Sequence, residues 1–403
     1  MYDLIIIGGG AAGFFGAIQT AERNPEAKIL ILEKSQKVLS KVKISGGGRC
    51  NVTHSCFDPK DMTTYYPRGT KELRGPFHRF LCGDMMGWLE DQGVETKIED
   101  DGRVFPISNN SQTIIDCFQE NCARHNIDIK LGNGVNSIIY NEELWEIKTK
   151  ETSYKTKAIL LATGSTPSVW KMLENMGHRI IPPVPSLFTF NIQHSLLKPL
   201  PGISVPNANV KILGTKFEDN GPLLITHWGF SGPAILKLSA WAARELHEKD
   251  YRFEIEVNWV NETEKNLRDI LAAVRRESGS RLLRNFQLVY IPKRLWHGML
   301  EHLKLMEKNY GDLTKKDIEA LIEMVGKCKF NVNGKSTFKD EFVTCGGVDT
   351  KEVNFKTMES KLFPKLYFAG EVLNIDAVTG GFNFQAAWTT SFIAAEEISN
   401  QIS

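Results

Sequence analysis

The chain has 403 residues, 42% of them hydrophobic and 24% charged, and this ordinary globular composition excludes a peptide, a disulfide-stabilised mini-protein and a disordered chain. Lysine and arginine number 49 against 48 aspartate and glutamate residues, so no excess charge favours nucleic acid or an anionic membrane. The seven cysteines are scattered without a Cys-x2-Cys pair, which predicts reduced thiols and no metal site. We therefore expect a cytoplasmic protein with a small-molecule substrate and with neither a nucleic acid nor a membrane partner. These numbers indicate no oligomeric state.

The first 33 residues are predicted to form a strand, a helix and a second strand. Leu4–Ile7 is an apolar run, an alanine-rich stretch continues to Arg23, and Ile29–Leu32 is again apolar. Because a right-handed crossover of this length returns a parallel neighbour, we expect a βαβ unit in a sheet buried on both faces. Two later apolar runs, Ala158–Ala162 and Leu366–Ala369, lead into glycine turns and are predicted to join the same sheet.

The middle of the chain follows a different pattern. Pro182–Pro185 is predicted to break regular structure and to mark an insertion boundary. From Tyr251 to Trp259 apolar and polar residues alternate, as in a strand with one buried face. From Asn261 the apolar spacing becomes helical, and Thr314-x-x-Asp317 matches a helix N-cap. We expect a discontinuous α/β domain from 1–185 and 336–403, an inserted β-rich domain from 186–260 and 326–335, and a helical domain from 261–325.

A glycine fingerprint lies between the first strand and its helix. Residues 8–13 fit G-x-G-x-x-G: Gly8 permits the tight turn, Gly10 lets a pyrophosphate approach the backbone, and Gly13 allows close helix–strand packing. Glu33 follows twenty residues after Gly13, where a carboxylate accepts the ribose hydroxyls of adenosine. We interpret the segment as a dinucleotide site, and the alternative is a glycine-rich turn without a ligand.

Three consecutive glycines follow shortly after Glu33. They precede an arginine and an asparagine in the run Gly46, Gly47, Gly48, Arg49, Cys50, Asn51. We interpret this run as a backbone cradle along a second stretch of cofactor, with the arginine and asparagine as fixed donors. The alternative is a flexible surface loop.

A second glycine turn opens the last predicted helix. A strand ends at Gly370 and Glu371, and Asp376 precedes the run that contains Gly381, Phe382 and Asn383. Unpaired amides at a helix N-terminus would stabilise the negative charge on N1 and the C2 carbonyl of a reduced flavin. The alternative is an ordinary left-handed entry turn.

Together, several segments resemble the signatures of one bacterial family. They are the N-terminal fingerprint and residues Gly46–Asn51, Gly102–Pro106, Thr226–Pro233, Val343–Val348 and Phe368–Glu371. Over nearly the whole chain they resemble the YhiN/BaiN-like family of aminoacetone-oxidase-like FAD-binding flavoproteins. The resemblance implies bound FAD and an α/β fold: a two-dinucleotide-binding-type FAD domain with a parallel sheet, an inserted β-rich domain and a helical domain.

The resemblance also implies further site residues. Those carried over as FAD neighbours are Ala12, Lys34, Lys41, Val135, Thr163, Gly164 and Gly347. The family commonly has Asp where Asn374 stands, so Asp376 is expected to supply the acid beside the flavin. His227 is the candidate catalytic residue on the substrate side, and the alternative is a structural histidine at a strand end.

We expect an FAD-dependent oxidoreductase that transfers hydride between the flavin and a small organic substrate. One alternative is an NAD(P)H-dependent flavin reductase or disulfide-type reductase. However, Cys50 and Cys56 enclose five residues rather than four, and the glycines at 132 and 134 lack a third glycine and a convincing preceding strand. NAD(P)H is retained as a transient electron donor. The other alternative is a non-catalytic FAD-binding regulator, and the basic run Lys265–Arg284 is interpreted as solvated surface.

Overall fold

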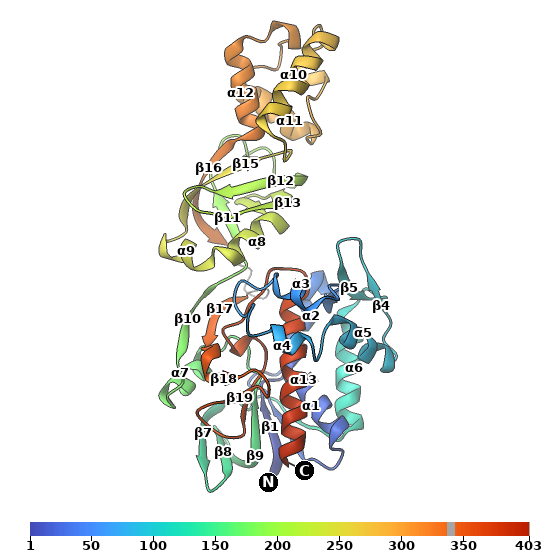
Figure 1. The fold of residues 1–403 in the computed structure, drawn as a ribbon, viewed down its shortest axis with the longest axis vertical. Helices are drawn as coiled ribbons and strands as arrows, with labels where there is room; N and C mark the ends of the chain where they lie inside the picture. Colours follow the sequence, from blue (N-terminus) through green and yellow to red (C-terminus); the bar gives the residue numbers. More distant parts are fainter. Residues whose placement is uncertain (337–342, 403) are drawn as a thin grey trace. The chain divides into compact units, whose positions relative to one another are not determined.

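The computed structural model describes residues 1–336 and 343–402, and the chain divides into two compact units (Figure 1). Unit 1 comprises Met1–Val184 and Lys339–Ser403, and unit 2 comprises Pro185–Phe338. Both chain ends therefore contribute to unit 1.

Unit 1 is built around a nine-stranded mixed sheet whose central strands, β20, β9, β1, β2 and β6, are parallel. Its strand order is β18 (Val353–Asn354), β19 (Glu359–Ser360), β20 (Leu366–Phe368), β9 (Ser153–Leu161), β1 (Tyr2–Ile7), β2 (Ile29–Leu32) and β6 (Asp128–Lys130), and the hairpin β7 (Val135–Asn141) and β8 (Leu144–Thr149) pairs with β9. Ile5 lies opposite Leu30 on one side and Ile159 on the other, both in parallel register. The predicted βαβ unit and the two later strands are confirmed.

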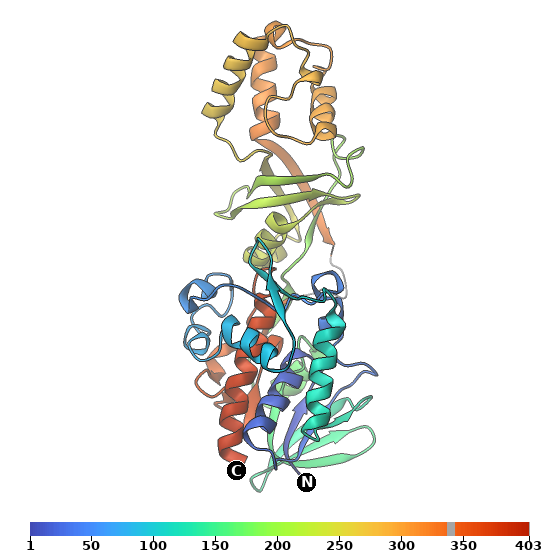
Figure 2. The same ribbon diagram turned by 90° about the vertical axis from the view of Figure 1, so that its right-hand side faces the viewer.

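Helices α1 (Ala11–Arg23), α6 (Ser111–Arg124) and α13 (Phe382–Ile402) lie side by side in unit 1 (Figure 2). Small residues bring α1 and α13 close together, since the Ser391 hydroxyl donates to the carbonyl oxygen of Ala12 at 2.8 Å. A Cβ atom on Gly16 would lie 2.6 Å from Leu160 of the sheet. The alanine- and glycine-rich sequence of α1 thus allows tight packing on both sides.

Shorter elements complete unit 1. They are α2 (Ser40–Gly48), β3 (Thr53–His54), α3 (Pro59–Thr63), α4 (Arg74–Phe77), α5 (Cys82–Asp91), β4 (Thr96–Ile98), β5 (Arg103–Pro106), α7 (Pro167–Asn175), β10 (Ile180–Pro185), β17 (Thr344–Val348), η3 (Thr350–Glu352) and η4 (Gly370–Val372).

Two sequence predictions about unit 1 are wrong. Residues 182–185, expected to break regular structure, belong to strand β10, which pairs with β17. Prolines are tolerated there because an edge strand does not need every amide as a donor. Strand β6 precedes Gly132, where no convincing strand was expected; its three residues are too few for a clear periodic signal.

Unit 2 contains a closed barrel in the order β11 (Thr189–Ile192), β14 (Gly229–Ser231), β13 (Glu218–Ile225), β12 (Ser204–Ile212), β15 (Arg252–Asn258) and β16 (Cys328–Ser336). Helices α8 (Pro233–Trp241) and α9 (Ala243–Glu248) precede β15, and α10 (Glu264–Ser278), η1 (Leu283–Asn285), α11 (Lys293–Leu303), η2 (Tyr310–Asp312) and α12 (Lys315–Gly326) follow it. The predicted alternation in β15 is observed, with Phe253, Ile255 and Val257 buried. Thr314 and Asp317 form the expected capping box of α12.

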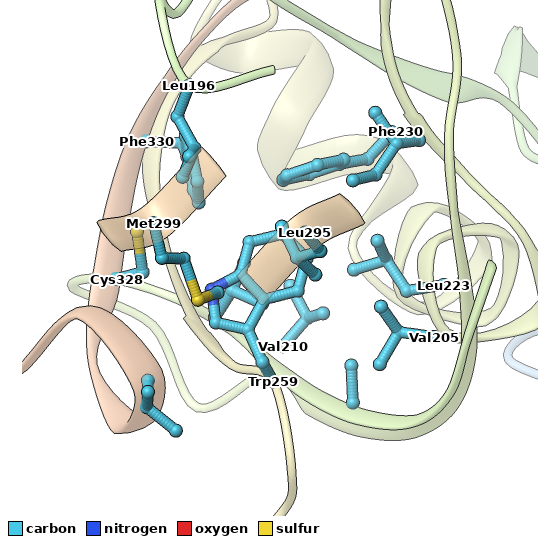
Figure 3. Packing of buried hydrophobic residues seen from close by; sticks show 14 of the residues in the cluster. Leu196, Val205, Val210, Leu223, Phe230, Trp259, Leu295, Met299, Cys328 and Phe330 are labelled. Atoms are coloured by element: carbon cyan, nitrogen blue, oxygen red, sulfur yellow. The ribbon is translucent and has the colours of Figure 1, made fainter. Parts of the chain in front are cut away.

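One hydrophobic core joins the barrel to the helices of unit 2. Figure 3 shows Trp259 among side chains from the barrel and from α11, including Met299. Its ring meets those of Phe230 and Phe330 edge to face, with centroids 5.7 and 6.0 Å away. Across the described residues, every helix is too short or too polar to cross a lipid bilayer.

Candidate functional site

The fingerprint glycines lie at the carboxyl end of β1. A Cβ atom on Gly8 would be 2.4 Å from the carbonyl oxygen of Ala162, and one on Gly13 would be 2.0 Å from the carbonyl oxygen of Gly8. These two positions therefore exclude a side chain. By contrast, no neighbouring atom of residues 1–336 or 343–402 lies within 4 Å of the Cβ position of Gly10, so among these residues the space before the N-terminus of α1 is open. This open space fits a pyrophosphate group.

The Glu33 carboxylate is fixed at the end of β2. It accepts hydrogen bonds from the amides of Gly9 and Ser35, both at 2.8 Å. The Cβ position of Gly134 lies 3.4 Å from the Lys34 side chain, which places the start of β7, at Val135, beside the end of β2. The structure thus brings together the residues predicted to bind the adenosine half.

The turn after β9 lies at the same edge of the sheet. Thr163 has its Cα atom 2.9 Å from the Cβ position of Gly8, and Gly164 follows with a positive φ of 60°. The Lys34 ammonium lies 3.5 Å from the hydroxyl of Thr166. Because the turns after β1, β2 and β9 end parallel strands, they lie at one edge of the sheet. The predicted cofactor contacts Gly8, Lys34, Thr163 and Gly164 therefore share that edge.

The predicted glycine cradle is a left-handed turn at the end of α2. Gly46, Gly47 and Gly48 have φ values of 59°, 70° and 84°, a region that glycine adopts at little cost. In the part of the chain that the structure describes, no neighbouring atom lies within 4 Å of the Cβ positions of Gly47 and Gly48, whereas that of Gly46 would be 2.8 Å from Phe105. Two glycines therefore face open space, and this turn fits a cradle for a second stretch of FAD.

The polar residues of the cradle are bonded within the protein. The Arg49 guanidinium lies 3.9 Å from the centroid of the Phe105 ring and donates to the Glu99 carboxylate at 2.6 Å. With the Asn51 amide turned to the orientation that satisfies both of its polar atoms, its nitrogen donates to the carbonyl oxygen of Thr53 and its oxygen accepts from the amide of Gly381, both at 3.0 Å. The two side chains expected to be donors to the cofactor thus brace the cradle, and Asn51 ties it to the start of α13.

Cys50 is completely buried beneath the cradle. Its amide donates to the carbonyl oxygen of Ser45 at 3.0 Å, and its φ is 60°. Burial raises the pKa of the thiol to about 12. Cys50 is therefore protonated at neutral pH and is a poor nucleophile.

The N-terminus of α13 presents unbonded amides. Among the described residues, the structure provides no acceptor for the amides of Phe382, Asn383 and Phe384. The Asn383 side chain instead bonds both main-chain polar atoms of Ala377, at 3.0 and 3.1 Å. A Cβ atom on Gly381 would be 2.5 Å from the carbonyl oxygen of Thr53. The amides fit a partial negative charge, such as that of a reduced flavin.

Asp376 is fully buried and forms a bidentate ion pair with Arg68. The Nε atom of Arg68 donates to Oδ1 at 2.6 Å, and a second guanidinium nitrogen donates to Oδ2. Asp376 was expected to be the acid beside the flavin, and this pairing neutralises its charge. No motif in the sequence indicates Arg68 as its partner.

Lys41 and Glu371 bring two further segments together. The Lys41 ammonium lies 2.5 Å from Oε2 of Glu371, whose Oε1 accepts from the Thr344 amide at 3.0 Å. The Gly370 Cβ position lies 3.2 Å from the Cβ atom of Ala12, so the end of β20 contacts the start of α1. Gly347 lies farther along β17, where its Cβ position is 2.5 Å from the carbonyl oxygen of Val372.

An aromatic cluster that the sequence analysis missed surrounds Phe382. The ring of Tyr65 stacks on Phe382 with centroids 4.1 Å apart, and that of His54 stacks at 4.6 Å. His54 Nε2 lies 3.1 Å from the carbonyl oxygen of Asp101. Burial raises the pKa of the Tyr65 phenol. His54 follows the cradle by three residues, but no pattern in the sequence indicates Tyr65.

His227 lies in unit 2, in the exposed turn between β13 and β14. The neighbouring Trp228 donates from its indole nitrogen to the hydroxyl of Thr189 at 2.9 Å. The cofactor residues predicted from the sequence all belong to unit 1, so the catalytic role of His227 stays a prediction.

Comparison with known families is decisive for the whole chain. A family model described as HI0933-like protein Rossmann domain matches residues 2–397. The chain belongs to this HI0933-like family. The predicted YhiN/BaiN-like membership and the α/β fold class are thereby confirmed, and the protein is an FAD-dependent oxidoreductase. The contacts of individual residues with FAD remain predictions.

Relatives in the HI0933-like family have assigned names. The chain is 28% identical to the ribosomal RNA dihydrouridine synthase of Escherichia coli and 29% identical to that of Haemophilus influenzae, with 98% of each chain covered. It is 26% identical to the 3-dehydro-bile acid delta(4,6)-reductase of Clostridium scindens, over 96% of this chain and 97% of that one.

Solved flavoenzyme structures share the fold. The 3-ketosteroid-delta4-(5alpha)-dehydrogenase from Rhodococcus jostii has a TM-score of 0.53 at 12% identity, covering 99% of this chain and 96% of that chain. The 3-ketosteroid delta1-dehydrogenase from Sterolibacterium denitrificans has a TM-score of 0.52 at 10% identity, with 99% of each chain covered. At these identities the likeness concerns the fold alone.

Proposed function

We propose that the protein reduces a carbon–carbon double bond conjugated to a carbonyl group, and that its substrate is a uridine of ribosomal RNA. The observation that carries this proposal is the similarity to two ribosomal RNA dihydrouridine synthases over 98% of the chain. A third relative, named as a bile acid reductase, supports a reductive direction. Unit 1 is proposed as the FAD-binding domain.

The reaction balances with one two-electron donor. The C5=C6 bond of uracil is conjugated to the C4 carbonyl, so C6 accepts a hydride and C5 a proton. Bound FAD supplies the hydride in its reduced state, and NADH or NADPH is proposed as the donor that restores that state. Each dihydrouridine formed therefore consumes one NAD(P)H and one proton.

Three groups of residues in unit 1 would hold the cofactor. The open space at Gly10 and the Glu33 carboxylate would take the pyrophosphate and the ribose. The open positions at Gly47 and Gly48 would let the chain pass close to FAD. The unbonded amides at the start of α13 would stabilise negative charge on the reduced ring system.

The Tyr65 phenol is the group in unit 1 that we propose as the proton donor. It is half-buried, it stacks on Phe382, and its raised pKa keeps it protonated at neutral pH. Tyr65→Phe should therefore retain FAD and its reduction by NAD(P)H but slow product formation on the order of 100-fold. Tyr140→Phe, on the β7–β8 hairpin, is the matched control. Equal rates for the two variants would remove Tyr65 from the mechanism.

Mass spectrometry of RNA tests the proposed reaction. The FAD-loaded protein is incubated with NADPH or NADH and unmodified ribosomal RNA transcripts, and the RNA is then digested to nucleosides. We expect one uridine to gain the mass of two hydrogens, and no gain with protein stripped of FAD. RNA of unchanged mass under all these conditions would contradict the proposal.

A small conjugated ketone is the second candidate substrate. The bile acid reductase relative favours it, and it agrees with the small organic substrate expected from the sequence. A steroid enone in the same assay separates the two candidates, since its reduction without any change in the RNA would favour the small molecule.

A further inference from the structure

A strongly basic segment lies on the helical part of unit 2. Residues 275–294, here called the basic segment, run from the last turn of α10 through η1 into the start of α11. Glu277 is the single acidic residue of the segment, against six basic ones: Arg275, Arg276, Arg281, Arg284, Lys293 and Arg294. The whole chain is balanced in charge, so the excess is local.

Most of this charge is not neutralised within the protein. Arg276 pairs with Glu277, and Arg284 pairs with Glu307. Within residues 1–336 and 343–402, the other four cations of the segment have no carboxylate partner: Arg275, Arg281, Lys293 and Arg294.

Neutral groups orient three of these four cations. Arg275 donates to the carbonyl oxygens of Tyr310 and Leu313, at 3.2 and 3.3 Å, and Arg294 donates to that of Pro199 at 2.9 Å. The Arg281 guanidinium lies 5.0 Å from the centroid of the Phe286 ring. Such contacts hold a guanidinium in place and leave its charge available to an anion.

The basic segment is also braced along its main chain. The Leu283 amide donates to the carbonyl oxygen of Lys308 at 3.0 Å, and the Tyr310 amide donates to that of Arg281 at 3.1 Å. Two buried side chains within the segment, those of Leu283 and Ile291, anchor it in the core of unit 2. Its cations therefore project from a preformed scaffold.

An aromatic side chain projects from the same segment. Tyr290 is 83% exposed, although the next residue, Ile291, is only 2% exposed. Tyr290 lies three residues before the exposed Lys293 and four before the exposed Arg294. Aromatic rings interleaved with cations are typical of surfaces that bind single-stranded nucleic acid, where bases stack on the rings and phosphates meet the cations.

We infer that the basic segment binds a single-stranded stretch of the substrate RNA, with its cations on the phosphates and Tyr290 stacked on a base. This inference rests on the proposed function, which supplies RNA as the partner. A base must leave its stack before an enzyme can act on it, so binding of an unpaired strand suits the reaction. The sequence analysis interpreted the basic run Lys265–Arg284 as a solvated surface. We now infer that part of this run binds RNA.

Fluorescence anisotropy with a labelled single-stranded RNA oligonucleotide tests the inference, using full-length FAD-loaded protein over a range of KCl concentrations. Arg281→Gln with Lys293→Gln should raise Kd on the order of tenfold and reduce the slope of log K against log salt by about 0.7 for each cation removed. Tyr290→Ala should raise Kd roughly five- to hundredfold with an unchanged salt slope. The matched control is Lys150→Gln with Lys155→Gln, on exposed residues of unit 1.

The outcomes separate this inference from the proposed function. If the variants bind RNA as tightly as the parent, or if the control pair loses as much affinity, the basic segment is not the RNA surface, whether or not dihydrouridine forms. If the segment variants lose binding while the parent forms no dihydrouridine, the surface stands and the proposed reaction fails. Binding of anionic vesicles in place of RNA would overturn both.

Discussion

At the scale of single residues, the most specific prediction about the cofactor is that Glu33 binds the ribose of FAD. Amides of Gly9 and Ser35 hold its carboxylate at the end of β2, where we predict that it accepts the ribose hydroxyls of FAD. Glu33→Ala should weaken FAD binding by about 1.5 to 3 kcal/mol, or roughly 10- to 100-fold in Kd. Titration of the stripped protein with FAD measures this change. Glu26→Ala, at an exposed site, should retain the parent affinity, and equal affinities for both variants would contradict the ribose assignment.

Asp376 illustrates a residue whose environment changes its expected role. Its buried carboxylate pairs with Arg68, so Asp376→Ala should leave a partly buried guanidinium without that partner. We expect a loss of about 3 to 5 kcal/mol in the free energy of unfolding, measured by urea denaturation at matched FAD content. Asp91→Ala, at the exposed end of α5, is the control. If Asp376→Ala leaves the free energy of unfolding unchanged but shifts the midpoint potential of the flavin, the original interpretation of Asp376 as the acid beside the flavin is supported.

Cys50 provides a test of the disulfide-type alternative. Because its pKa is raised to about 12, the folded state disfavours the thiolate. This pKa difference makes a contribution to the free energy of unfolding that is fully present below the pKa of the unfolded thiol, about 8.5. The contribution is lost as the pH rises from there toward the pKa of the folded thiol. We expect Cys50 to resist iodoacetamide in mildly alkaline buffer until urea is added, as peptide mapping would measure.

The double variant Cys50→Ser with Cys56→Ser completes this test. It should retain most of the parent turnover at equal FAD content. A collapse of turnover with FAD still bound would favour the thiol reductase.

At the scale of elements, the N-terminus of α13 is expected to tune the flavin. Asn383→Asp adds a negative charge to the first turn at nearly constant size. This charge offsets the partial positive charge of the helix N-terminus, which would otherwise stabilise the reduced flavin. We expect the flavin midpoint potential to fall by roughly 6 to 40 mV, which corresponds to about 0.3 to 2 kcal/mol over two electrons. Asn400→Asp, near the other end of the helix, should leave the potential unchanged. Equal potentials for both variants would mean that the start of α13 does not face the flavin.

Strands β1, β9 and β20 of unit 1 could be predicted because each is an apolar run that ends in a glycine turn, and β2 because it is a short apolar run at crossover distance from β1. Their contacts at the site could not. Asn51 bonds the Gly381 amide and Arg68 pairs with Asp376 across about 300 residues of sequence, and neither pair forms a local pattern. The same limit applies to Gly381: a Cβ atom there would be 2.5 Å from the carbonyl oxygen of Thr53, a packing requirement that no local pattern shows, and its contact with the flavin stays a prediction.

At the scale of the whole molecule, segments from both chain ends bring the predicted cofactor residues together in unit 1. Parallel pairing of β20 with β9, and of β9 with β1, places the turns after these strands on one edge of the sheet. The fingerprint and the family resemblance therefore predicted the cofactor. They did not predict the substrate, and the relatives named for ribosomal RNA supplied that hypothesis.

The central claim is that reduced FAD on this protein is oxidised by a uridine of ribosomal RNA. Anaerobic stopped-flow spectroscopy measures this step directly, by mixing the photoreduced holoprotein with an unmodified ribosomal RNA fragment. We predict that the absorbance of oxidised flavin returns, and that it returns more slowly with Tyr65→Phe. We also predict that the flavin released from the protein by heat is FAD. A flavin that stays reduced with every uridine-containing RNA, while a steroid enone oxidises it, would contradict the claim.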